Sequence, residues 1–192
     1  MALLPPISAR EVVEGVYGAT RLARGDPHGI KFFGDTPEAF WKSFWAAIVA
    51  APIHALLLAI GLVDAKVTSG WLRVIVIETV AYFVLWTAFP LAMHYVAELI
   101  DRDDRYIRFI CAANWSFVLQ ATFSLFMQAL LSIDLPGFVS GLLSLATLAA
   151  LLLYSWFIAR VGLELSRLGA VGIVALDVMI SLVINRIVHA ML

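Results

Sequence analysis

The stretch that decides the fold is Gly162–Leu192, GLELSRLGAVGIVALDVMISLVINRIVHAML. It is long enough to cross the apolar core of a bilayer, which is about 30 Å thick and takes about 20 helical residues. It nevertheless carries Asp177 near its middle and Arg186 near its end. Ionisable groups at this depth are costly unless neighbouring helices surround and satisfy them. The stretch therefore predicts a packed bundle of several membrane-spanning helices.

The composition of the whole chain agrees with a lipid environment. Of the 192 residues, 62% are hydrophobic and only 14% are charged, whereas soluble domains are about half apolar and about a quarter charged. The net charge of -1 provides no basic surface for nucleic acid. The single cysteine, Cys111, excludes a disulfide framework and a Cys-based zinc site within one chain.

Apolar runs separated by short polar turns predict an all-α polytopic membrane protein with five transmembrane helices. The expected spans cover residues 44–63, 71–97, 109–132, 138–159 and 168–190, and the shortest turns are expected at 64–70 and 133–137. Because no internal repeat or linker interrupts this pattern, we expect residues 36–192 to form a single transmembrane domain.

Residues 1–35 are expected to form an N-terminal interfacial segment. Ser8 and Glu11 have the spacing of a capping box, and the apolar residues that follow at helical spacing predict a short amphipathic helix over residues 8–24. Such a helix lies on the membrane surface or a partner, or packs back on its own bundle. The sequence leaves both alternatives open.

The basic residues predict how the chain is oriented. With five spans, ten of the thirteen would lie on the side of the N-terminus: Arg10, Arg21, Arg24, Lys31, Lys42, Arg102, Arg105, Arg108, Arg160 and Arg167. Lys66, Arg73 and Arg186 would lie on the other side. Because short cytoplasmic segments are enriched in Lys and Arg, we expect a cytoplasmic N-terminus and an outer C-terminus in a bacterial inner (cytoplasmic) membrane.

Polar groups inside the spans are the first set of candidate functional residues. They are His54, Glu78, Gln120, Asp177, Ser181, Asn185 and Arg186. Asp177, Ser181 and Asn185 share one helix face because they are four residues apart. Similar depths make an ion pair between Glu78 and Arg186 feasible, with His54 nearby. Two interpretations stay open: a proton or ion relay in a small transporter or channel, and polar contacts that only hold the helices in register.

Two surfaces expected on the cytoplasmic side form the second set of candidates. The helix at 8–24 offers Arg10, Glu14, Tyr17 and Arg21, and the charged loop at 98–108 offers Asp101, Arg102, Asp104 and Arg105. These residues predict contacts with another membrane protein or a second copy of the chain. The leading hypothesis is therefore a non-catalytic membrane scaffold or accessory subunit without a cofactor.

A membrane enzyme is the weakest hypothesis for this sequence. His94, Glu98 and Asp101 are spaced closely enough to suggest a metal site. The second histidine of a zinc-protease helix is missing, and no glycine pattern of a calcium loop or phosphate-binding loop is present. We therefore expect no enzymatic activity.

The segment Tyr154–Ala170, YSWFIARVGLELSRLGA, consists of a span end, a short turn and the start of a Gly/Ala-rich final helix. It resembles the corresponding region of bacterial members of the YIP (Ypt-interacting protein) membrane family, whose five-span layout is similar over residues 36–192. The resemblance implies this architecture. Eukaryotic members carry a D-L-Y-G-P signature and bind Rab-type GTPases. That signature is absent here, so the resemblance implies no GTPase binding and no residue role.

Overall fold

The computed structural model describes residues 4–65, 70–133 and 135–192, and in these residues the protein is helical without β-strands. The elements are α1 (Ala9–Ala23), the 3₁₀ helix η1 (Pro27–Phe32), α2 (Pro37–Ser43), α3 (Trp45–Ala65), α4 (Trp71–Leu99), α5 (Asp103–Leu131), α6 (Gly137–Gly162) and α7 (Arg167–Met191). The all-α prediction is confirmed. Lys66 and parts of the predicted turns 64–70 and 133–137 lie outside the described residues.

Five of the helices are long and apolar enough to cross a membrane, which confirms the predicted number of spans in the described chain. The largest difference from the predicted boundaries is at α5, which begins at Asp103 instead of residue 109. Asp103 and Asp104 lie in the first turn of α5, where negative charge interacts favourably with the helix dipole. The charged residues expected in a loop therefore extend the helix.

The N-terminal helix α1 begins at the predicted capping box. The backbone N–H of Glu11 donates to the Ser8 hydroxyl at 3.2 Å, and the Ser8 N–H donates to the Glu11 carboxylate at 2.7 Å. The helix then packs on α5, η1 and α6, and Leu22 on its inner face is buried. Of the two alternatives left open by the sequence, the structure shows packing on the bundle.

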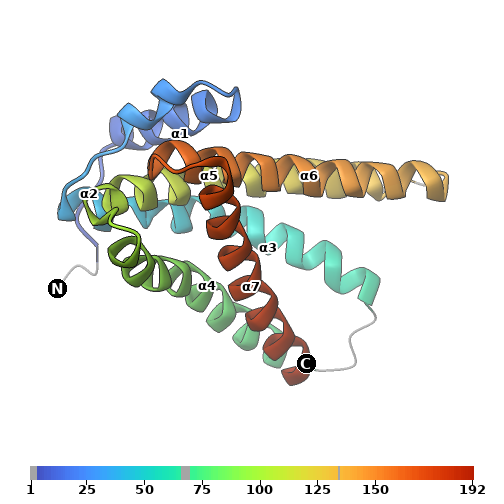
Figure 1. Cartoon of the computed structure of the whole chain (residues 1–192). Helices are drawn as coiled ribbons and strands as arrows, with labels where there is room; N and C mark the ends of the chain where they lie inside the picture. Colours follow the sequence, from blue (N-terminus) through green and yellow to red (C-terminus); the bar gives the residue numbers. More distant parts are fainter. Residues whose placement is uncertain (1–3, 66–69, 134) are drawn as a thin grey trace.

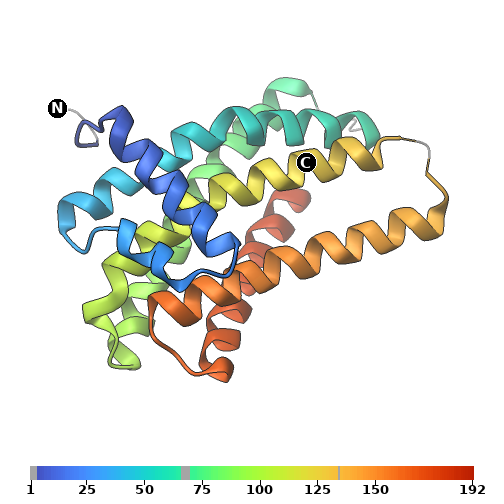
Figure 2. The ribbon, with the colours of Figure 1, turned by 90° about the horizontal axis from the view of Figure 1, so that it is seen from above.

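The five long helices separate into two groups. In the first group α3 packs on α5 and α5 on α6, and in the second group α4 packs on α7, which also touches α6. Figures 1 and 2 show that α4 and α7 leave the layer of α3, α5 and α6 at an angle. We call the end where α1, η1 and α2 lie the N-terminal end of the bundle and the opposite end the distal end. The two groups diverge towards the distal end.

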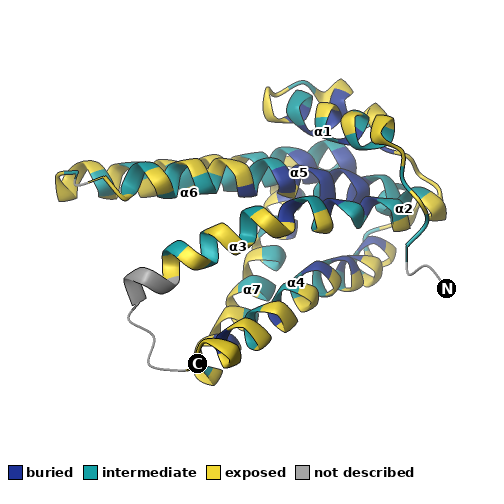
Figure 3. Cartoon of the chain, turned by 180° about the vertical axis from the view of Figure 1, so that it is seen from behind, coloured by how far each residue is buried: buried dark blue, intermediate teal, exposed yellow. Residues whose placement is uncertain are grey.

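Buried residues are concentrated at the N-terminal end, as Figure 3 shows. Phe109, Ile110 and Leu163 are among the buried residues of this core. At the distal end Phe138 is 82% exposed and Leu145 is 67% exposed. Because lipid chains are as apolar as these side chains, a membrane can cover this surface without another protein layer.

Candidate functional site

A cavity with a volume of about 310 Å³ lies between the two groups of helices, and all five spans contribute to its wall. Its polar lining consists of His54, Tyr82, Asn114, Gln120, Ser155, Asp177 and Ser181. Its aromatic lining includes Trp86, Phe89, Phe109 and Phe117 in addition to Tyr82. A largely apolar pocket with a few polar groups is typical of small-molecule sites.

The cavity brings together four of the seven polar residues predicted in the spans. His54 comes from α3, Gln120 from α5, and Asp177 and Ser181 from the same face of α7. Asn185 continues this face of the helix but does not line the cavity, and it is exposed. The helical periodicity of α7 therefore predicted the polar face, but not where the cavity ends.

Among the described residues that line the cavity, Asp177 is the only carboxylate. It is ten residues from Arg167, where α7 begins, which is about 15 Å along the helix axis. Its side chain is half-buried, and no described residue donates a hydrogen bond to it or forms an ion pair with it. An unpaired carboxylate in low-dielectric surroundings is costly. A cation or a proton entering the cavity would reduce that cost.

His54 lines the same cavity from α3. Its ring packs against Tyr82, with 4.7 Å between ring centroids, and its Nε2 is buried without a hydrogen-bond partner in the described structure. The Tyr82 hydroxyl donates to the Ala47 carbonyl at 2.7 Å. That bond connects α4 to α3 and fixes the ring against which His54 packs.

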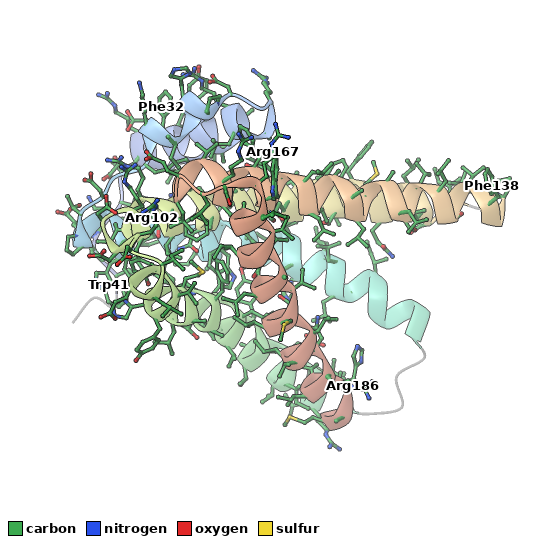
Figure 4. The ribbon with its side chains drawn as sticks, viewed as in Figure 1. Phe32, Trp41, Arg102, Phe138, Arg167 and Arg186 are labelled. Carbon is green, nitrogen blue, oxygen red and sulfur yellow. The ribbon has the colours of Figure 1, made fainter. Side chains whose placement is uncertain are left out.

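The ion pair considered between Glu78 and Arg186 does not form, so this part of the sequence-based hypothesis is wrong. Neither side chain makes a salt bridge in the part of the chain that the structure describes. Arg186 is exposed at the distal tip of α7, as Figure 4 shows. Similar depths in the membrane did not imply an ion pair: α4 and α7 pack on each other, but their contact does not bring these two side chains together.

Three polar lining residues, Asn114, Ser155 and Tyr82, were not among the predicted site residues. Asn114 of α5 donates to the Ser43 hydroxyl at 2.8 Å. Ser155 of α6 donates to the Gln120 amide oxygen at 3.5 Å, a long hydrogen bond between neighbouring helices. Tyr82 is the third. Its spacing of four residues from both Glu78 and Trp86 was the only available signal, because it places all three on one face of α4.

The predicted contact residues between α4 and α5 are largely occupied by contacts within the chain. Arg105 forms ion pairs with Asp104 and with Glu164 of the α6–α7 turn. Arg102 donates from its Nε to the Leu163 carbonyl at 3.1 Å. These contacts connect the start of α5 to the end of α6. Asp101 remains exposed.

The predicted contact residues of α1 differ in whether their side chains already have partners within the chain. Arg21 forms an ion pair with Asp26 across the turn that follows α1. The Arg10 and Glu14 side chains pair with each other at 2.7 Å on the surface. Tyr17 contacts the ring of Phe32 edge-on at 5.0 Å between centroids and stays half exposed. The outer face of α1 therefore keeps an accessible surface, while Arg21 has a structural partner.

The suggested metal site around His94 is not assembled. The described residues contain no group of three or more His, Cys, Asp or Glu side chains that could hold a metal ion. The His94 ring instead lies beside Tyr95 and Tyr106, with centroids 5.4 and 5.6 Å away. The cluster therefore contributes aromatic packing at the N-terminal end.

Comparisons with known proteins add no functional information to this geometry. No family model matches the chain, and no curated protein or solved structure matches it. The resemblance to the YIP family stays a prediction. The cavity is therefore the feature from which a function has to be inferred.

Proposed function

We propose that the protein is a small multi-pass carrier that takes a solute into the cavity between its spans, with Asp177 as the central binding group. The observation that supports this proposal is an unpartnered carboxylate in a cavity lined by all five spans. Ionisable residues at membrane depth are expensive and mark solute or ion pathways. A purely structural role would be expected to give Asp177 a hydrogen-bond partner.

The burial of the cavity wall indicates the side from which a solute enters. Phe109, Ile158 and Ile173, towards the N-terminal end, are buried. Asp177 and Ser181, farther along α7, are only half-buried. We therefore propose that the cavity opens towards the distal end and is closed at the N-terminal end. Pro90 of α4 lines the closed part and is a natural hinge, because proline interrupts helix hydrogen bonding.

Cysteine labelling tests whether the cavity is accessible from water. The only native cysteine, Cys111, is buried, so background labelling should be low. We expect Ser181→Cys to react with a small charged thiol reagent, whereas Leu145→Cys on the lipid-facing surface of α6 should not. Equal labelling of the two variants, or none at position 181, would contradict an open cavity.

Flux measurements test the carrier function itself. Reconstituted vesicles with a trapped pH dye should show proton or cation-coupled flux that Asp177→Asn abolishes. Glu78→Gln is the matched control, because it removes another carboxylate from a span without touching the cavity wall. An unchanged flux in Asp177→Asn would refute the proposal.

We also propose that this carrier lies in a bacterial inner membrane with its N-terminus in the cytoplasm. The support is the distribution of basic residues: Arg102 and Arg167 lie at the N-terminal end and Arg186 at the distal tip (Figure 4). Tags at the two termini should be reached by an impermeant reagent from opposite sides of the membrane. Labelling of both tags from the same side would contradict the orientation.

The membrane scaffold or accessory subunit, which was the leading hypothesis from the sequence, is the second candidate function here, and the outer face of α1 supports it. There Val13 is 67% exposed and Tyr17 is 50% exposed, while Leu22 on the inner face is buried. If α1 docks another membrane protein or a second copy of the chain, Val13→Glu should release a partner that co-purifies with the native protein. The control Glu14→Gln should retain it. Retention by both variants would exclude docking through this face.

A further inference from the structure

We infer that the solute of this cavity is an organic monocation: one positively charged nitrogen on a compact aromatic or branched apolar body. The inference rests on the proposed function, because it names the class of solute that the same site would accept. It combines the charge of the wall, its aromatic surface and its volume. Each of these excludes a different class of ligand.

The charge of the wall favours a cation over an anion. In the described part of the chain, Asp177 is the only acidic residue that lines the cavity, and no lysine or arginine lines it. Arg186, on the same helix, is nine residues farther along α7 and exposed. A positively charged ligand would therefore supply the partner that Asp177 lacks, in a site where screening by water is weak. For an anion, the described lining offers neither lysine nor arginine, and its only basic side chain is the His54 imidazole.

The aromatic surface favours an organic ligand with a diffuse positive charge. The rings of Trp86 and Phe117 meet edge to face with 5.1 Å between centroids, and those of Tyr82 and Trp86 are 6.1 Å apart. Ring faces attract ammonium groups, most strongly when the group is removed from water. The same rings bury the apolar body of the ligand. One carboxylate beside several aromatic rings is thus suited to an alkylammonium group.

A bare metal ion fits this wall poorly. Magnesium and calcium take about six to eight oxygen ligands, and the described residues form no acidic or histidine cluster of that kind. The cavity volume of about 310 Å³ is at the lower end of the range for small-molecule sites, about 300–1,000 Å³. That volume suits a ligand with one ring and a small ammonium group.

Binding of benzyltrimethylammonium to the full-length protein in lipid nanodiscs tests this inference. We expect saturable binding by isothermal titration calorimetry, and binding at least tenfold weaker for Asp177→Asn. Trp86→Leu should weaken binding several-fold, since it removes the ring that interacts best with cations. Glu78→Gln should bind within twofold of the native protein. Benzyl alcohol and benzoate, which have the ring without the positive charge, should bind at least tenfold more weakly.

Native-like binding by Asp177→Asn would overturn the inference, and so would equal binding of benzyl alcohol and the cation. Asp177→Glu is the control for a folding defect. It keeps the negative charge, so it should retain binding if the carboxylate is the recognition group. Loss of binding in both the Glu and Asn variants, with native melting temperatures, would also count against it. If flux depends on Asp177 but the protein binds no organic cation, the proposed class of solute is wrong and the proposed carrier function is retained. If the protein binds the cation but shows no flux, the proposed carrier function is wrong and the proposed cation-binding site is retained.

Discussion

The two ends of the bundle are held together in different ways. At the N-terminal end, side chains bond across long sequence separations: Asn114 of α5 donates to Ser43 of α2 at 2.8 Å, and Tyr154 of α6 donates to the Ala19 carbonyl of α1 at 2.7 Å. Towards the distal end, the hydroxyl of Thr147 bonds to a carbonyl of its own helix. The N-terminal end thus fixes the relative positions of the helices, whereas the distal end leaves them apart.

This difference has a physical origin in the solvent of each region. Loops and helix ends carry backbone polar groups that need partners, and α1, η1 and α2 supply many of those contacts at one end. Apolar helix surfaces in lipid gain no hydrophobic free energy by packing together, since the lipid chains are equally apolar. A bundle fixed at one end and open at the other can therefore enclose a cavity where its helices diverge.

The largest expected effect is at Gly15, where α1 lies against α5. A Cβ atom there would be 2.6 Å from the buried ring of Trp115, so a side chain can enter only if the ring or the helix moves. We expect Gly15→Leu to lower the stability of the N-terminal end by about 3 kcal/mol, the upper range for overpacking. Thermal unfolding in mild detergent, together with protease sensitivity of α1, measures this effect.

Gly141 provides the matched control at the distal end. A Cβ atom there would have no neighbour within 4 Å. Gly141→Leu should therefore leave the melting temperature unchanged or raise it, because glycine is a poor helix former. An equal decrease in the melting temperatures of Gly15→Leu and Gly141→Leu would contradict the proposed division between a packed and an open end.

The next largest effect is expected at Tyr154, the residue that connects α6 to α1. Its hydroxyl bonds to the Ala19 carbonyl at 2.7 Å and to the Ser116 hydroxyl at 2.9 Å. Tyr154→Phe leaves these groups without that partner and should cost about 1–2 kcal/mol. Thr147→Val removes a hydroxyl that bonds only within its own helix and should cost much less. Melting temperatures of the two variants test this order.

The fold was predictable where one helix carries the signal by itself. The apolar runs predicted the five spans, and Ser8 with Glu11 predicted the start of α1 to within one residue. The face shared by Asp177 and Ser181 was also visible from their spacing. Each of these features depends on the local periodicity of one segment, which the sequence contains directly.

Features that depend on the angles between helices were not predictable. The Glu78–Arg186 pair required the distal ends of α4 and α7 to hold those side chains together, which the structure does not do. Tyr82 and Ser155 meet in one cavity only because α4 and α6 both contribute to its wall. A single sequence predicts how far along its helix each residue lies. It does not predict which faces of neighbouring helices are in contact.

A smaller effect is expected at Glu11, which helps to hold α1 in place. The Lys42 ammonium, 2.7 Å away, and the Ser8 N–H and hydroxyl lower the pKa of Glu11 to about 2 from its usual 4.5. The stabilisation is therefore fully present above about pH 4.5 and is lost as the pH falls towards 2. Glu11→Gln should cost about 1 kcal/mol at pH 6, the usual value of a helix cap.

Melting temperatures at pH 6 and pH 3 separate this effect from a general loss of stability. The difference between Glu11→Gln and the native protein should shrink at the lower pH. At pH 3 the Glu11 carboxyl is largely protonated in the unfolded chain, where its pKa is about 4.5, but still largely ionised in the folded protein, where it is about 2. Glu14→Gln, which removes an exposed pair with Arg10, should show little difference at either pH. If the difference in melting temperature between Glu11→Gln and the native protein is the same at both pH values, the charge of the carboxylate does not contribute to stability.

The smallest effect is expected for Arg186→Gln at the distal end. Arg186 is exposed and makes no ion pair among the described residues, so its removal should change stability by less than about 0.5 kcal/mol. A double-mutant cycle with Glu78→Gln should give a coupling energy near zero. If the distal helices instead close during the working cycle and bring the two charges together, the cycle would show coupling, and flux would fall in the single variant while stability stayed the same. That result would confine the open distal end to one conformation of the protein.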